Sequence, residues 1–183
     1  MATARTPREA WIDAGLSALA DGGPDAVRIE ALARTLGVTK GGFYGYFTDR
    51  SDLLDHMLDT WERRSGADVV ATVDALDSST LGRAVRAAEL TFSPELLPID
   101  MAIRDWARRD PDVAERLRRV DNLRMDLLRT SFRPLFPDPT ELEARCLLAF
   151  SAAIASDLIA ADHPDLTRDV VLDRATTLLF PES

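Results

Sequence analysis

Residues 37–54 read GVTKGGFYGYFTDRSDLL and contain the only lysine of the chain, Lys40. Gly41 and Gly42 follow it directly, where a short helix is expected to begin. Glycine weakens a helix by roughly 0.5–1 kcal/mol relative to alanine. Two phenylalanines and two tyrosines then occur within residues 43–47. The protein is acidic and all its other Lys or Arg positions are arginine. Its one lysine nevertheless stands beside two glycines, which destabilise a helix.

The segments on either side predict two short helices joined by a tight turn. The first helix is expected over residues 29–36, and Gly37 stands in the glycine position that commonly ends a helix. Thr39 can cap the second helix, which is expected to reach about Tyr46. These lengths are those of a helix-turn-helix, whose second helix enters the major groove of DNA by its N-terminal end.

The composition of the second helix fits a surface that approaches DNA. Lys40 supplies a mobile positive charge, and Gly41 and Gly42 remove side-chain bulk, so that backbone and DNA can come close. The phenols of the two tyrosines can donate to phosphates while their rings pack. Phe43 and Phe47 are four residues apart on one helix face and are expected to point into the core.

The distribution of charge supports DNA contact for this part of the chain alone. The 183 residues carry a formal net charge of −9, which makes the whole protein a poor default candidate for nucleic acid. Residues 1–50 are neutral, with six Lys or Arg and six Asp or Glu, whereas residues 51–183 contain 16 and 25. The N-terminal fifty residues therefore stay open as a nucleic-acid-binding unit.

The periodicity of the apolar residues predicts an all-α protein of about nine helices, because it is helical almost throughout and no run favours a strand. Thr6, Pro7 and Glu9 give a strong start signal for the first helix. The expected helices cover residues 7–21, 29–36, 39–46, 49–76, 80–92, 95–108, 110–134, 139–162 and 166–180.

Several classes of protein are disfavoured by what the sequence lacks. Cys146 is the only cysteine, so no intrachain disulfide is expected. No apolar run approaches 18 residues and the N-terminus has no signal-peptide pattern, so a cytoplasmic location is expected. No nucleophile elbow, P-loop or dinucleotide-binding glycine pattern occurs, and neither His56 nor His163 has a partner at metal-ligand spacing. We therefore predict no enzyme, no catalytic residue, no metal and no cofactor.

Residues 6–54 resemble the DNA-binding domain of the TetR family of bacterial transcriptional regulators. The residues that carry the resemblance are Trp11-Ile12-Asp13-Ala14, Leu16, Gly23, Leu32-Ala33, Gly37-Val38-Thr39-Lys40-Gly41, Phe43-Tyr44, Tyr46-Phe47, Arg50 and Leu53-Leu54. Three positions depart from the family pattern. Arg28 stands where Ser or Thr usually caps the second helix, Gly15 replaces a usual alanine, and Gly42 replaces a usual small polar residue.

The resemblance implies a regulator that binds double-stranded operator DNA as a homodimer, most commonly a repressor released by a small-molecule effector. It implies a helix-turn-helix domain in residues 1–50 and an effector-binding and dimerisation domain in residues 51–183. The predicted DNA-binding residues are Arg28, Thr39, Lys40, Gly41, Gly42, Tyr44, Tyr46 and Arg50. Two alternatives stay open, a helical protein-interaction regulator whose head reads no DNA and, with less support, a helical enzyme.

The family holds effectors among its middle helices, so large residues there are expected to line a mostly apolar pocket or to form core. The candidates are Trp61, Phe92, Met101, Arg104, Trp106, Met125, Leu128 and Phe132. Asp100 and Arg104 lie one helical turn apart and are expected either to edge the pocket or to pair with each other. The arginines and acids of residues 100–121 alternate, as is typical of a salt-bridged solvent face.

The resemblance also implies that the last two helices form the dimer contact. Their apolar residues occupy more than one helix face, and alanines among them allow close helix approach, so a four-helix bundle across two chains is expected. The predicted interface residues are Leu142, Ala149, Phe150, Ala153, Ile154, Leu158, Val171 and Leu178.

Overall fold

The computed structural model describes residues 7–75, 93–155 and 158–179, together with Gly82, Arg86 and Leu90. Every regular element in these residues is helical, which confirms the predicted all-α class. The helix expected over residues 80–92 falls mostly outside the described residues. The elements are α1 (Arg8–Gly22), η1 (Pro24–Ala26), α2 (Ile29–Thr35), α3 (Lys40–Phe43), α4 (Arg50–Glu62), η2 (Arg63–Ala67), α5 (Asp68–Asp74), α7 (Leu97–Ala107), α8 (Pro111–Phe132), α9 (Pro139–Ala155) and α10 (Arg168–Leu178).

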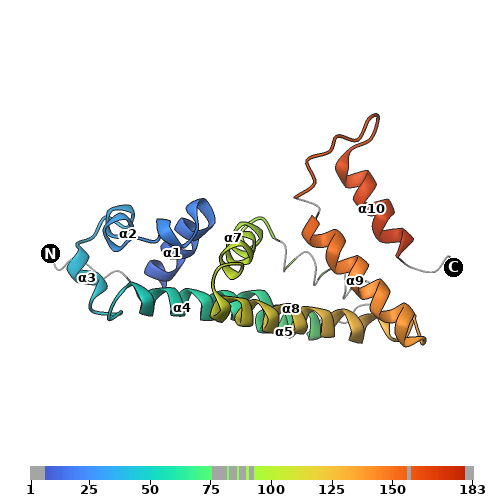
Figure 1. The fold of residues 1–183 in the computed structure, drawn as a ribbon, viewed down its shortest axis with the longest axis horizontal. Coiled ribbons are helices and arrows are strands. Elements are labelled where there is room, and N and C mark those ends of the chain that lie inside the picture. The colour runs from blue at the N-terminus through green and yellow to red at the C-terminus, as the bar shows by residue number, and fades with distance from the viewer. Residues whose placement is uncertain are drawn as a thin grey trace.

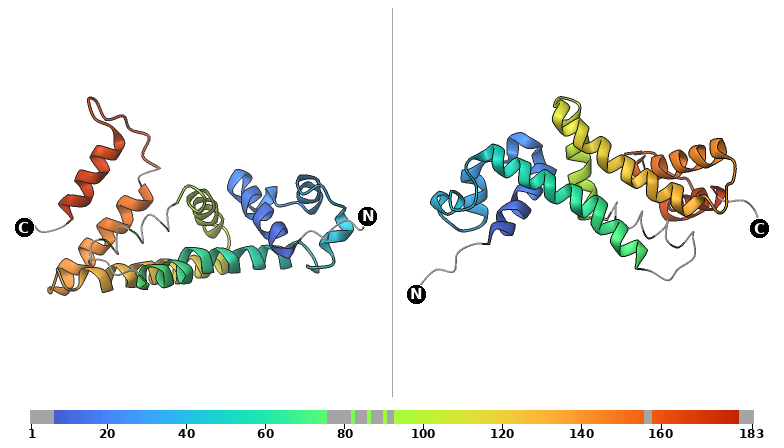
Figure 2. Two further views of the ribbon diagram at one scale, coloured as in Figure 1. Left: turned by 180° about the vertical axis from the view of Figure 1, so that it is seen from behind. Right: turned by 90° about the horizontal axis from the view of Figure 1, so that it is seen from below.

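One long helical path leads from the head to the middle of the molecule, and α8 continues toward the opposite end (Figure 1). We call residues 8–49 the head, the path α4–η2–α5 the linker helix, and α7–α10 the body. The linker helix runs beside α8, and α9 and α10 lie at the end away from the head in all three views (Figures 1 and 2). The single helix predicted over residues 49–76 is therefore confirmed in outline, but η2 interrupts it with a π-helical turn that the periodicity did not indicate.

The turn between α2 and α3 has the geometry that its glycine predicts. Gly37 has a φ of 67°, and the Val38 N–H donates to the Ala33 carbonyl at 2.9 Å, which closes a Schellman motif. Thr39 precedes α3 in an extended conformation but its side chain makes no capping hydrogen bond, so the predicted cap is wrong. The α-helical part ends at Phe43, and residues 44–46 form a turn instead of the predicted last turn of helix.

The N-termini of the other helices in the head agree only in part with the caps expected from the sequence. The Asp49 carboxylate accepts from the Asp52 N–H at 3.0 Å and caps α4. Arg28, which replaces the family's capping residue, leaves α2 without a side-chain cap. Helix α1 begins at Arg8 with Pro7 at its N-cap position, one residue later than predicted, and Thr6 lies outside the described residues.

One hydrophobic cluster runs from the head through the linker helix into the body. Phe43 and Phe47 are buried in it as predicted, and the Phe43 ring meets Trp11 edge-on with centroids 5.4 Å apart. Ile103 of α7 and Val113 of α8 belong to the same cluster, because α1 packs against both α4 and α7. The head and the body therefore share a core and are joined by packing as well as by the chain.

A second cluster joins the end of α8 to α9. It contains Phe132, Phe136, Leu142 and Cys146, with the rings of the two phenylalanines 6.1 Å apart. Burial of the Cys146 thiol raises its pKa to about 11, so the lone cysteine is an unreactive core residue, as expected from its apolar neighbours. Helix α10 has no buried residue of its own.

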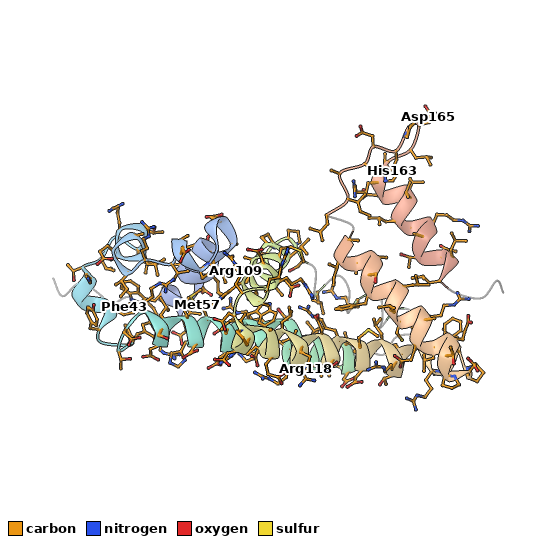
Figure 3. The ribbon with its side chains drawn as sticks, viewed as in Figure 1. Phe43, Met57, Arg109, Arg118, His163 and Asp165 are labelled. Carbon is orange, nitrogen blue, oxygen red and sulfur yellow. The ribbon has the colours of Figure 1, made fainter. Side chains whose placement is uncertain are left out.

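The departure at Gly15 has a packing reason. Gly15 is buried where α1 crosses α4, and a Cβ atom built there would lie 2.6 Å from the Met57 Sδ. Met57 is itself fully buried in the shared core, and Figure 3 shows it between α1 and α4. Glycine at this position lets the two helices approach more closely than alanine would allow.

We predict that Gly15→Ala destabilises the protein by roughly 1 kcal/mol. Overpacking costs about 1–3 kcal/mol, and the better helix propensity of alanine returns about 0.8–1 kcal/mol of it. Denaturant unfolding followed by circular dichroism measures the change, with Gly41→Ala as the control, because the nearest atom to a Cβ at Gly41 is 3.8 Å away. A Gly15→Ala protein at least as stable as the parent would contradict this account of the crossing.

Candidate nucleic-acid interface

Lys40 is already paired in the free chain. It is about half exposed, and its Nζ lies 2.5 Å from Oε1 of Glu30, which belongs to the other helix of the helix-turn-helix. Hydrogen bonding and attraction to Glu30, with a smaller part from Tyr44, raise the pKa of Lys40 above its ordinary value. The same contact lowers the pKa of Glu30. Any phosphate that approaches Lys40 therefore competes with a carboxylate.

Neither glycine of α3 is required by the fold. Gly41 and Gly42 do not have the positive φ that favours glycine, which among the described glycines occurs at Gly23 and Gly37. A Cβ at Gly41 would come no closer than 3.8 Å to Thr39 Oγ1, and one at Gly42 no closer than 4.0 Å to Trp11 Cζ2. Both are ordinary contacts. The free head could therefore carry alanine at either position without a steric clash.

The two tyrosines differ in how available they are. Tyr44 is 54% exposed and rests on the edge of Phe43 with the ring centroids 5.3 Å apart. Tyr46 is half-buried and packs against the shared core beside Phe47. Tyr44 therefore presents its phenol to solvent, whereas part of Tyr46 is used in packing.

Arginines 28 and 50 make hydrogen bonds inside the head. The Arg50 Nε donates to the Val27 carbonyl at 2.7 Å and a terminal nitrogen donates to the Pro24 carbonyl, which fastens η1 to the start of α4. Arg28 is exposed, and its Nε donates to the Asp25 carbonyl at 3.1 Å. For Arg50 the structure thus gives a positioning role that the sequence did not predict, and its contact with phosphate stays a prediction.

A cleft of about 390 Å³ lies between the head and the body. It is bounded by η1, the first half of α4, and the turn between α7 and α8, and of the predicted effector residues only Trp106 lines it. The other residues that line it are Pro24, Asp25, Arg50, Ser51, Leu54, Asp55, Leu58, Asp110, Asp112, Val113 and Arg116. Its wall contains four aspartates and two arginines, so it differs from the mostly apolar pocket that was predicted.

The predicted effector residues do not converge on one place. Trp61 and Phe132 are 0% and 1% exposed and lie in core clusters of the free chain. Their place in an effector pocket stays a prediction. Met125 and Leu128 pack on the cluster around Phe132, whereas Trp106 packs on the shared core. Met101 and Arg104 are half-buried, and Phe92 lies outside the described residues.

Asp100 and Arg104 pair with each other, at 2.8 Å, but within a larger network that sequence reasoning missed. Asp100 is completely buried and also accepts from Arg124, at 2.8 Å, and from the Trp61 indole. Arg104 forms two further bonds with Asp121, of 2.7 and 2.9 Å. The spacing of residues could not predict this network, because Arg124 is far from Asp100 in the sequence. A helical pattern also does not show which residue of another helix will pair with a buried charge.

The rest of this charged region behaves as predicted. Arg109 bonds to Asp105 and Arg118 bonds to Glu115, both at 2.7 Å and both exposed. Arg118 projects from the outer side of α8 in Figure 3. The alternating charges therefore form a salt-bridged solvent face, with the buried Asp100 as the exception.

The predicted interface residues fall into three groups. Leu142 is buried in the second cluster of its own chain, and its part in a dimer contact stays a prediction. Leu158 and Leu178 are both more than 60% exposed. Ala149, Phe150, Ala153, Ile154 and Val171 are half-buried. Further large apolar residues of this region are exposed as well, namely Leu147, Leu148, Ile159, Leu166 and Val170.

The described residues contain neither a membrane-spanning helix nor a cluster of metal ligands. No helix there is long and apolar enough to cross a membrane. No group of three or more metal-ligating side chains gathers there either.

Comparison with solved structures supports the fold along nearly the whole chain. The transcriptional regulator FadR from Bacillus subtilis, solved with stearoyl-CoA, superimposes with a TM-score of 0.68 at 12% identity, covering 95% of this chain and 98% of that one. AibR, solved with isovaleryl coenzyme A and operator DNA, gives a TM-score of 0.67 at 14% identity, covering 94% and 97%. At these identities the likeness shows the fold alone.

Comparison of sequences identifies the head. An uncharacterised HTH-type transcriptional regulator of Bacillus subtilis strain 168, YwcC, is 33% identical over 91 residues, which are 46% of this chain and 40% of that protein. Residues 12–57 match the family described as bacterial regulatory proteins, tetR family. This match contains both helices of the helix-turn-helix and most of α4. The resemblance seen in the sequence is therefore confirmed for the head, whose residues 12–57 are similar to the tetR family of bacterial regulatory proteins.

Proposed function

We propose that this chain is a transcriptional regulator that binds operator DNA as a homodimer through α2 and α3, and that a small, mainly apolar effector releases it. The observation that carries the DNA-binding part is the pair of glycines in α3. They weaken the helix and the free head does not need them, so a surface that approaches the backbone closely is the simplest reason for them.

The chemistry around the glycines is that of a phosphate-binding surface. Lys40 and Tyr44 are both exposed on the face that carries Gly41, and each can donate to a phosphate oxygen. The first fifty residues have no net charge, so general attraction to DNA is weak and each cation at the surface matters. Affinity must then come from the fit of two heads to one site.

The distribution of exposed apolar residues supports assembly through α9 and α10. Of the ten exposed large apolar residues in the described part of the chain, seven lie within residues 147–178. Helix α10 has 11 residues and none is buried, and a helix of that length is marginal without packing. Arg145 attaches its end to α9 by bonds to the Leu178 and Leu179 carbonyls. A second copy of the chain would cover this surface.

The effector class follows from the acidic body and the apolar residues of the middle helices. Residues 51–183 carry the whole net charge of −9, which disfavours a polyanion, so we propose an uncharged or weakly polar effector. The two similar structures hold acyl thioesters of coenzyme A, which makes an acyl-CoA the second class to test. The cytoplasmic location stays a prediction.

The test of this function is binding of the purified protein to the DNA upstream of its own gene. We expect a retarded complex on a gel, and an unrelated duplex of equal length should not displace the upstream DNA from it. Addition of the effector should return the upstream DNA to its free position. Neutral apolar compounds and acyl-CoA thioesters are screened by thermal shift to find it. Equal affinity for both duplexes would contradict a DNA-reading head and favour a regulator that acts by protein contact.

Removal of Lys40 is expected to weaken binding to all DNA alike. One phosphate contact is lost, so the slope of log affinity against log salt should fall by about 1. Fluorescence anisotropy over a range of salt concentrations measures the change in Lys40→Ala, with Arg118→Ala on the outer face of α8 as the control. An unchanged slope would mean that Lys40 does not contact the duplex.

Removal of Glu30 is expected to act in the opposite direction. Glu30→Gln frees Lys40 from its carboxylate, so affinity for DNA should rise a few-fold in the same anisotropy assay. The gain should disappear when Lys40 is already alanine, because the two residues act through one contact. Weaker binding by Glu30→Gln would show instead that the carboxylate holds Lys40 in its binding position.

Gly42→Ala separates folding from DNA binding. We expect the free energy of unfolding to stay the same or rise by about 0.5–1 kcal/mol, because no atom obstructs the methyl group. Affinity for the upstream DNA should fall at least tenfold. Denaturant unfolding and anisotropy give the two values, and Gly15→Ala, which loses stability but keeps its DNA-facing surface, is the matched control. If Gly42→Ala binds the upstream DNA as tightly as the parent does, DNA does not lie close to the backbone at this position.

Charges placed on α9 and α10 are expected to separate the dimer. The double variant Leu147→Glu and Leu178→Glu puts carboxylates on two residues that are about 60% exposed in the single chain. Sedimentation equilibrium should give a dimer for the parent at micromolar concentration and a monomer for the variant. Leu135→Glu, which lies between α8 and α9, should remain dimeric. A monomeric parent would overturn the proposed assembly.

A further inference from the structure

The linker helix contains a π-helical turn at Arg63–Ala67, between α4 and α5. The Asp68 N–H donates to the Arg63 carbonyl, five residues back instead of four. Such a turn holds one residue more than an α-helical turn, and it is frequent at functional sites. Because one residue corresponds to about 100° around a helix, its presence sets the direction in which everything on its N-terminal side points. The whole head lies on that side.

Contacts from other helices hold this turn at several consecutive residues. Arg64 bonds to Asp13 of α1 at 2.8 Å. Glu62, just before the turn, accepts from Arg116 and Arg119 of α8 at 2.9 and 3.1 Å. The Gly66 backbone lies so close to α8 that a Cβ there would be 2.8 Å from the Leu123 Cδ2. The turn is thus pressed against α8, which belongs to the body.

Arg124 is the buried centre of these contacts. It is 5% exposed, and its guanidinium donates to the Ser65 carbonyl within the turn at 3.4 Å and to Asp100 of α7 at 2.8 Å. Asp100 in turn accepts from the Trp61 indole, on the α4 side of the turn, at 3.3 Å. Arg124 of α8 therefore contacts the turn directly and, through Asp100 of α7, is connected to the α4 side of the turn.

We propose that Arg124 is a positioning residue for DNA binding, which fixes the π-helical turn and thereby the orientation of the head on the body. The proposal rests on the function given above. Two heads of a dimer must face half-sites about one helical turn of DNA apart, so each head needs a defined direction. A planar guanidinium suits this role, because its fixed fork can bond a carboxylate and a carbonyl at once. Ser65 and Asp100 supply these two acceptors.

The first experiment measures head orientation without DNA. Spin labels are placed at Ser17→Cys on the exposed side of α1 and at Thr130→Cys on α8, with Cys146→Ala, and labelled chains are diluted with unlabelled ones. Double electron–electron resonance then gives the head-to-body distance within one chain. We expect one narrow distribution for the parent and a distribution at least twice as wide, or displaced by several ångströms, for Arg124→Met.

Two further variants separate positioning from folding. Arg124→Met leaves Asp100 buried without one partner and can unfold the protein, so Asp100→Asn with Arg124→Met is measured beside it, because replacing both members of a buried pair is often tolerated. Arg118→Met, on the same helix but bonded only to Glu115, should keep the parental distribution. A folded double variant that keeps the parental distance and width would overturn the proposal.

The second experiment connects orientation to function. The double variant should bind the upstream DNA at least tenfold more weakly than the parent, while its affinity for unrelated duplex and its salt slope stay the same. A loss of affinity for both duplexes with an unchanged distance distribution would also overturn the positioning role. If the parent itself does not distinguish the two duplexes, the proposed function fails, and the distance measurement alone decides whether Arg124 orients the head.

Discussion

The packing of α1 against both α4 and α7 is the contact on which the rest of the molecule depends. It makes a single cluster of buried residues from Trp11 in the head to Val120 in the body. Each fully buried large apolar side chain contributes about 1.5–3 kcal/mol. Separating the head from Ile103, Val113 and Val120 would therefore cost several kcal/mol. The head cannot swing freely on the linker helix, and a signal from the body must pass through this shared surface.

Local patterns predicted the head well because local interactions decide it. Gly37 ends α2 with a positive φ, and the spacing of Phe43 and Phe47 places both rings in the core. The contacts of residues in the body were predicted less well. Helical spacing shows which residues share one face of a helix, but not which other helix packs against that face. Leu142 was expected at the dimer interface and Trp61 in a pocket or in the core, and the packing of distant helices buries both of them in core clusters.

The two kinds of ion pair in this chain suit different tasks. Lys40 and Glu30 are both largely exposed, so water and phosphate can replace either partner with little loss. Asp100 and Arg124 are buried, and removing one member of such a pair costs about 3–5 kcal/mol because the other charge is left uncompensated. The exchangeable pair lies on the proposed DNA surface and the fixed pair lies beside the linker helix. This division matches a head that must bind and release while its direction stays defined.

The glycines of α3 can be tolerated because tertiary packing, and not helix propensity, stabilises that helix. A helix of four residues has no stability of its own, and α3 is held by Phe43 against Trp11 and by the turn that precedes it. Positions 41 and 42 are therefore released from the requirement to favour a helix. Glycine at these positions leaves the backbone beside Lys40 and Tyr44 free of side chains. The proposed operator DNA could then approach that backbone closely. The shared core thus does more than join head and body, since it also stabilises a short helix that contains two adjacent glycines.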